Sequence, residues 1–137
     1  MTHEDYVSFE QAKNLKELGF DWEIEYFYGL NDANEPKLYR YPDILGGQDN
    51  HNKYHGSFSA PTLAQVQKWL REVKGIALNI IAHDGGFYQW ESIFLPKAPV
   101  PVFIDYIVPD YYLYDTYEQA LSAGLSLIIG LIKAEGK

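Results

Sequence analysis

The chain has 137 residues, no cysteine and a formal net charge of −8, from 11 basic and 19 acidic residues. The lack of cysteine excludes disulfides, thiol nucleophiles and cysteine-ligated zinc. The acidic balance argues against a protein that grips the phosphate backbone of nucleic acid, because such proteins need a basic face. With an apolar fraction of 47%, we expect one domain spanning residues 1–137.

The first predicted element is a helix over Phe9–Leu18. It opens with Ser8-Phe9-Glu10-Gln11, a hydroxyl residue with Gln three positions later, which is the capping-box pattern of a helix start. Gly19 follows the last periodic residue and suits a left-handed C-terminal cap. Alternating aromatic and acidic residues then predict a strand from Phe20 to Tyr28, and Lys37–Tyr41 is the return strand of a hairpin.

Pro42–Pro61 is the least regular stretch, and it holds His51 and His55, four residues apart. So long an irregular stretch in a compact domain predicts a functional or a mobile loop. Two histidines at this spacing occur in zinc sites, and Asp49 could add a third ligand. We expect instead that both histidines are solvated, and we name no metal site and no cofactor.

The second helix is predicted over Leu63–Lys74, from Thr62-Leu63-Ala64-Gln65 and an apolar stripe that ends at Val73. Residues 76–83 alternate as a strand does, Asp84-Gly85-Gly86 is a strong hairpin turn, and residues 87–95 return. Residues 102–108 are flanked by prolines and would supply a fifth strand at an edge of the sheet.

Thr116-Tyr117-Glu118-Gln119 opens the third helix, which reaches Lys133. This helix is apolar over most of its circumference, so we expect it to be the most buried one. Gly124 and Gly130 each cost about 1 kcal/mol relative to alanine, and close packing against the sheet would explain both. The elements together predict an α+β fold, a two-layer antiparallel sheet of four to five strands with three helices, in the order α-β-β-α-β-β-(β)-α.

Tyrosine is the most unusual component of the chain. Five tyrosines fall within twelve residues around the start of the third helix, namely Tyr106, Tyr111, Tyr112, Tyr114 and Tyr117. Tyrosine joins a large apolar ring to a polar tip and is enriched in protein interfaces. One interpretation is that these rings line the rim of the core. The other is that they form a partner-binding or self-association surface at the edge of the sheet.

Three stretches, residues 6–20, 60–72 and 114–120, resemble a family of small bacterial proteins that are often encoded in phage or prophage regions and have no assigned activity. The resemblance implies a cytoplasmic protein and transfers no catalytic residue. The order α-β-β-β-α from the second helix onward is also similar to the double-stranded-RNA-binding fold. That fold carries basic residues near the start of its last helix, where this chain has Asp110, Asp115 and Glu118.

No catalytic, metal or nucleotide-binding motif is present, so we name no catalytic residue. We predict a non-enzymatic, cytoplasmic protein-interaction domain of phage or prophage origin. Its partner would be another protein or a second copy of the chain. We expect no nucleic-acid partner, because of the acidic balance, and no membrane, because the longest apolar run is too short to span a bilayer. Two alternatives stay open: a small metal-dependent enzyme that uses the His51–His55 loop, and an acidic mimic of nucleic acid.

Overall fold

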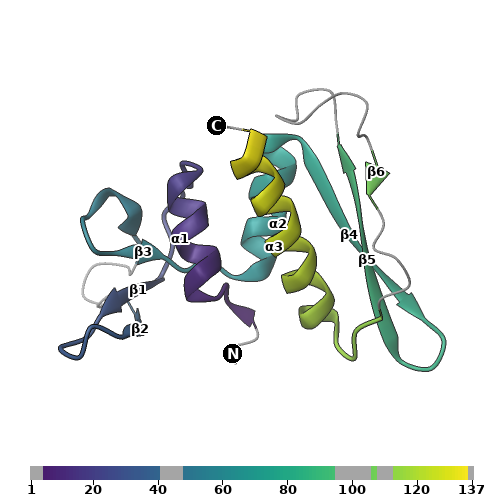
Figure 1. Cartoon of the computed structure of the whole chain (residues 1–137), viewed down its shortest axis with the longest axis horizontal. Helices are drawn as coiled ribbons and strands as arrows, with labels where there is room; N and C mark the ends of the chain where they lie inside the picture. The colour runs from purple at the N-terminus through teal and green to yellow at the C-terminus, as the bar shows by residue number, and fades with distance from the viewer. Residues whose placement is uncertain (1–4, 41–47, 95–105, 108–112, 136–137) are drawn as a thin grey trace. The chain divides into compact units, whose positions relative to one another are not determined.

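Three α-helices and two small antiparallel sheets make up the part of the chain that the computed structural model describes, which is residues 5–40, 48–94, 106–107 and 113–135 (Figure 1). The predicted α+β class is therefore confirmed. Contacts along the chain define two units, Tyr6–Thr62 and Leu63–Lys137 with Met1–Asp5. We call them the N-terminal and the C-terminal unit. That the two units fold together as a single domain stays a prediction.

The N-terminal unit contains helix α1 and a sheet in the order β2-β1-β3. Its elements are α1 (Phe9–Glu17), β1 (Tyr26–Leu30), β2 (Pro36–Arg40) and β3 (Phe58–Ser59). The capping box of α1 is confirmed in both directions. Ser8 Oγ accepts the Gln11 backbone N–H at 3.1 Å, and Gln11 Oε1 accepts the Ser8 N–H at 2.8 Å. The predicted stop is also confirmed, since Gly19 has a φ of +87°.

Aromatic contacts join α1 to its sheet. The Phe9 ring makes edge contacts with Tyr28 and Phe58, at centroid distances of 5.6 and 5.3 Å. The hydroxyl of Tyr28 donates to the Val7 carbonyl at 2.7 Å, so its polar tip is satisfied while its ring is packed. The buried apolar side chains of this unit are Val7, Ala12, Leu15, Phe20, Ile24 and Ala60.

The C-terminal unit places helix α3 on a sheet in the order β4-β5-β6, with α2 beside α3 (Figure 1). Its elements are α2 (Leu63–Trp69), the π-helical turn η3 (Leu70–Lys74), β4 (Ile76–His83), β5 (Phe87–Phe94), β6 (Tyr106–Ile107) and α3 (Tyr117–Glu135). The second hairpin lies where the alternation predicted it, and Gly85 and Gly86 both take the positive φ that its turn needs. None of the described helices has the length and apolar run that crossing a membrane needs.

The predicted single sheet of four to five strands is not found; the described strands fall into two sheets instead. The reason lies in the neighbours of the two inner strands. β1 pairs with β2 on one side and on the other with β3, a strand from the stretch that sequence reasoning left irregular. β5 pairs with β4 and β6, so neither inner strand leaves an edge for the other hairpin.

The second predicted helix ends differently from expectation, because its last turn is a π-turn. The π-helical hydrogen bond spans one residue more than that of an α-helix, so residues late in the turn are rotated away from the α-helical face. Trp69 and Leu70 stay buried, but Val73, which the periodicity assigns to the core stripe, is 48% exposed.

The two glycines of α3 have different surroundings. A Cβ on Gly124 would lie 2.9 Å from Leu78 Cδ1 and 3.0 Å from Trp90 Cγ, so the predicted close packing is confirmed there. A Cβ on Gly130 would meet no described atom within 4 Å. Packing on the sheet therefore accounts for Gly124 and not for Gly130. At the start of α3 the Thr116 hydroxyl accepts the Gln119 N–H at 3.1 Å, as the capping pattern predicts.

This difference yields a matched pair of substitutions. We expect Gly124→Ala to lower the free energy of unfolding by about 1–3 kcal/mol, because the added methyl overlaps packed side chains. Gly130→Ala is expected to raise it by about 0.5–1 kcal/mol through helix propensity alone. Urea denaturation followed by circular dichroism measures both, and stabilisation by both changes would contradict the packing of α3 described above.

Candidate functional site

The tyrosine-rich stretch is described only in part. Tyr111 and Tyr112 lie outside the described residues. Of Tyr106 the backbone is described, and it pairs with Ile93 in the β5–β6 ladder. The two remaining predicted site residues, Tyr114 and Tyr117, lie immediately before α3 and at its first position.

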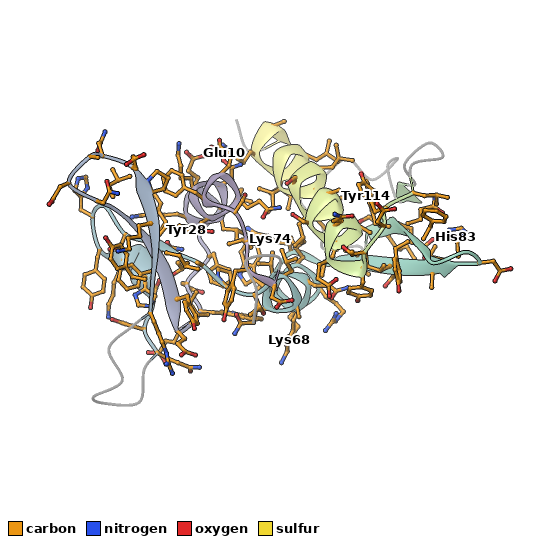
Figure 2. The ribbon with its side chains drawn as sticks, turned by 90° about the horizontal axis from the view of Figure 1, so that it is seen from below. Glu10, Tyr28, Lys68, Lys74, His83 and Tyr114 are labelled. Carbon is orange, nitrogen blue, oxygen red and sulfur yellow. The ribbon has the colours of Figure 1, made fainter. Side chains whose placement is uncertain are left out.

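Tyr114 and Tyr117 are brought together with Tyr88, a residue of β5 that the sequence did not mark as functional. Tyr88 and Tyr114 exchange two backbone hydrogen bonds, each 2.8 Å long. The Tyr88 ring meets the Tyr117 ring edge-on, with centroids 6.2 Å apart and planes at 78°. The one feature of the sequence that could have indicated Tyr88 is that strand alternation places it on the same face as Trp90. Figure 2 shows Tyr114 near the N-terminal end of α3, on the side of the β4–β5 hairpin.

The outer part of this cluster is open to solvent. Tyr117 is 42% exposed and Leu113, which precedes Tyr114 in the chain, is 44% exposed, while Tyr88 and Tyr114 are half-buried. We call Tyr88, Leu113, Tyr114 and Tyr117 the tyrosine patch. Exposed aromatic and aliphatic side chains that gather on a surface are typical of interaction sites.

The charged residues nearest to Tyr114 and Tyr117 along the chain are acidic. From Leu113 to Ile132 the only charged residues are Asp115 and Glu118. Asp115 is exposed and Glu118 is half-buried. The patch therefore offers aromatic faces beside carboxylates and, along this stretch, no basic side chain.

His51 departs from expectation. It begins the short 3₁₀ turn η2 (His51–Lys53) and is buried, with 2% of its surface exposed, so the prediction that it is solvated is wrong. Its Nε2–H donates to the Ile24 carbonyl at 2.9 Å, and its backbone N–H donates to Ser59 Oγ at 3.1 Å. The ring stacks on Phe27 at a centroid distance of 4.5 Å.

The burial of His51 bears on metal binding. A carbonyl only accepts hydrogen bonds, so Nε2 carries the proton and the lone pair of the neutral ring is on Nδ1. His55, in contrast, is exposed. Within the described ranges, no group of three or more His, Cys, Asp or Glu residues is arranged to hold a metal ion.

The residues around His51 form a network of hydrogen bonds that orders this segment. Asn52 Nδ2 donates to the Phe20 carbonyl at 2.8 Å, and Asn52 Oδ1 accepts the Ser59 N–H at 2.8 Å. Lys16 of α1 donates to the carbonyls of Tyr54 and Ser57 at 2.9 and 2.8 Å. Burial lowers the pKa of Lys16 from its ordinary value. The described part of the predicted loop is thus fixed to α1 and to the residues before β1.

Asp49 is the acidic residue nearest to His51 in the chain. Lys53 Nζ lies 3.1 Å from its Oδ1, and the Tyr54 hydroxyl donates to its Oδ2 at 2.9 Å. The hydrogen bonds from Lys53 and then from Tyr54 lower the pKa of the Asp49 carboxyl. Both carboxylate oxygens thus have partners within this turn, which fits a structural role.

No protein-family model matches the chain, and no curated protein or solved structure is significantly similar to it. The conclusions on function therefore depend on the residues and on their geometry.

The buried His51 predicts a pH dependence of stability. Burial is the main reason that its pKa lies below the ordinary value of 6.5. In the unfolded chain the His51 ring takes up a proton near pH 6.5, while in the folded chain it does so only at lower pH. The free energy of unfolding therefore has its full value above pH 6.5 and decreases as the pH falls below 6.5. We expect an NMR titration of the His51 ring to give a midpoint below 6.5.

A matched pair of variants isolates this effect. His51→Gln is expected to flatten the pH dependence of urea stability below about pH 6.5, whereas His55→Gln, a change at an exposed histidine of the same segment, leaves it in place. An unchanged slope in His51→Gln would show that His51 is not the titrating group.

Proposed function

We propose that the chain is a non-enzymatic protein-interaction domain and that the tyrosine patch is its contact surface. The observation that carries this proposal is the exposure of Tyr117 and Leu113 on a backbone held by two hydrogen bonds between Tyr88 and Tyr114. Because these groups are already ordered, little conformational entropy is lost when a partner binds them. A phage or prophage origin and a cytoplasmic site of action belong to the same proposal, and they rest on the resemblance of the three helix starts.

The chemistry of the tyrosine patch favours a partner with basic side chains. An arginine or lysine can lie over an aromatic ring and at the same time meet a carboxylate such as Asp115. Desolvated contacts of this kind supply much of the binding energy at protein interfaces. A net charge of −8 would also attract a basic partner over longer distances at low salt.

The two alternatives have less support. A metal-dependent enzyme built on the His51–His55 loop would need further ligands beside the two histidines, and among the described residues no group of three or more His, Cys, Asp or Glu is arranged to hold a metal ion. A mimic of nucleic acid would need carboxylates spaced along one surface like phosphates, and the acidic residues of the sequence are scattered and never form a block of five. If the captured partner is itself a nucleic-acid-binding protein, competition by DNA or RNA for the same site would favour the mimic.

The interaction proposal predicts the effect of substitutions in the tyrosine patch. We expect Tyr117→Ala combined with Leu113→Ala to reduce capture of a partner from bacterial or phage-infected lysate at least about tenfold, because exposed aromatic anchors are removed. Leu127→Ala is the matched control, since Leu127 is another exposed leucine of the same unit, 46% exposed on α3. Quantitative mass spectrometry of the captured proteins measures the ratio. Equal capture by all variants would refute the role of the patch.

A second expectation concerns RNA. The C-terminal unit has the element order α-β-β-β-α that the double-stranded-RNA-binding fold also has, but acidic residues lie at the start of α3. We expect no detectable binding to double-stranded RNA or DNA near physiological salt, because a net charge of −8 opposes association with the phosphate backbone. A gel-shift assay checks this, and micromolar binding that weakens steeply with salt would overturn it.

A further inference from the structure

β4 is an edge strand of an uncommon kind. All eight of its residues pair with β5 in an unbroken register, from Ile76 opposite Phe94 to His83 opposite Phe87. On its other side no described strand pairs with it. An unpaired edge presents a row of backbone donors and acceptors that a further strand can use.

The hydrogen bonds of neighbouring residues show which groups of β4 point off this edge. The backbone N–H and carbonyl of Tyr88 bond Tyr114 and so point away from β4. Ala82 is the register partner of Tyr88, so its backbone N–H and carbonyl point away from β5. Leu78 has the same parity, and its carbonyl accepts Gln67 Nε2 at 2.7 Å. Ile80 lies between them. Gln67 of α2 thus occupies the edge at Leu78. No described strand pairs with the segment after it, Ile80–Ala82, which we call the β4 edge.

The two edges of the molecule that carry longer strands differ in their protection. β2 is an edge of the other sheet and carries Pro36, Lys37 and Arg40, with Arg40 in an ion pair with Glu25. Proline and charge are the usual devices that stop an edge from recruiting another chain. β4, with the sequence IALNIIAH, has no proline, no bulge and no Asp, Glu, Lys or Arg.

We propose that the β4 edge pairs with the β4 edge of a second copy of this chain, antiparallel and across a two-fold axis at Ile81. In this register Ile80 lies opposite Ala82 of the second copy, and each such pair exchanges two backbone hydrogen bonds. The strand is its own complement, because its outward residues, Ile80 and Ala82, are symmetric about Ile81. The sheets of the two copies would then join into one.

Charge and side chains favour a second copy over an unrelated strand. The chain carries a net charge of −8, yet no formal charge lies on β4, so this edge lets two copies meet without opposing like charges. The Ile81 side chains of the two copies would lie side by side at the axis, in a pair that is not hydrogen-bonded, where strands are closest. Ala82 is exposed and Ile80 is half-buried, so the large and the small side chain face each other.

Within the tyrosine patch, Tyr88 lies opposite Ala82 in the β4–β5 ladder, on the side of β4 away from the β4 edge. The inference rests on the backbone of β4 and does not depend on the proposed function. Because only a short ladder forms, the interface is far smaller than about 1,200 Å² and a weak dimer is expected. Its test therefore uses a covalent trap together with a concentrated sample.

The absence of cysteine gives a clean cross-linking experiment. Ile81→Cys is expected to form a disulfide-linked dimer under mild oxidation, because residues opposite each other in such a pair have Cα atoms about 4.5 Å apart, within disulfide range. Asn79→Cys on the same face of the same strand is expected to stay monomeric, because it would lie opposite His83. A mixture of Asn79→Cys and His83→Cys is expected to link. Non-reducing gels and intact mass measure all three.

Sedimentation of the cysteine-free chain gives the second measurement. We expect concentration-dependent dimers at up to about 1 mM, and a dissociation constant raised at least tenfold by Ala82→Pro, which removes an outward N–H without touching the β4–β5 ladder. A monomer at every concentration would overturn the proposal. So would dimers that Ala82→Pro leaves unchanged, or cross-links that form as readily through Asn79→Cys alone. The Leu113→Ala, Tyr117→Ala variant is expected to form dimers like those of the unaltered chain, because neither residue lies on β4, so the two proposals fail separately.

Discussion

The close approach of α3 to the β4–β5 hairpin at Gly124 is the constraint on which the C-terminal unit depends. Without a side chain at this position, the helix backbone lies against Leu78 and Trp90, one from each strand. The helix thereby holds both strands at once and buries Leu125 and Ile128 below it. The same contact fixes the N-terminal end of α3 near β5, where the Tyr88 ring meets Tyr117. The position of Tyr117 at the surface thus depends on the packing of Gly124, two helical turns away.

Sequence periodicity predicts the elements of this unit well where local signals agree. Alternation over Ile76–His83, a Gly-Gly turn and a capping threonine at 116 each define one boundary, and the structure has those boundaries. Val73 shows the limit of such reasoning. The apolar stripe assumes α-helical geometry to the end of the helix, while the widened π-turn rotates Val73 outward. Nothing in the local pattern distinguishes the two geometries.

Tertiary contacts account for what the sequence could not predict elsewhere. β3 is only two residues long, so it has no period to detect, yet it takes the second edge of β1 and thereby separates the two sheets. His51 has the neighbours of a loop residue in sequence, and its burial comes from Ile24 and Ser59, which are distant in the chain. In the tyrosine patch, composition alone indicated Tyr114 and Tyr117, but the pairing with Tyr88 required the register of β5.

The β4–β5 hairpin uses its two outer edges unequally. On the β5 side the outward backbone groups are taken by Tyr114 and by β6, so the chain closes that edge itself. On the β4 side, in the part of the chain that the structure describes, the Gln67 side chain donates to the Leu78 carbonyl. An edge that is wholly open invites unlimited strand addition, whereas an edge that is wholly covered recruits nothing. Because Gln67 occupies the carbonyl of Leu78, only the short β4 edge after it can pair with another strand. Such a short segment does not favour pairing in other registers. Since antiparallel pairing across a two-fold axis consumes the open edge of both copies, such an association closes at two chains and cannot propagate.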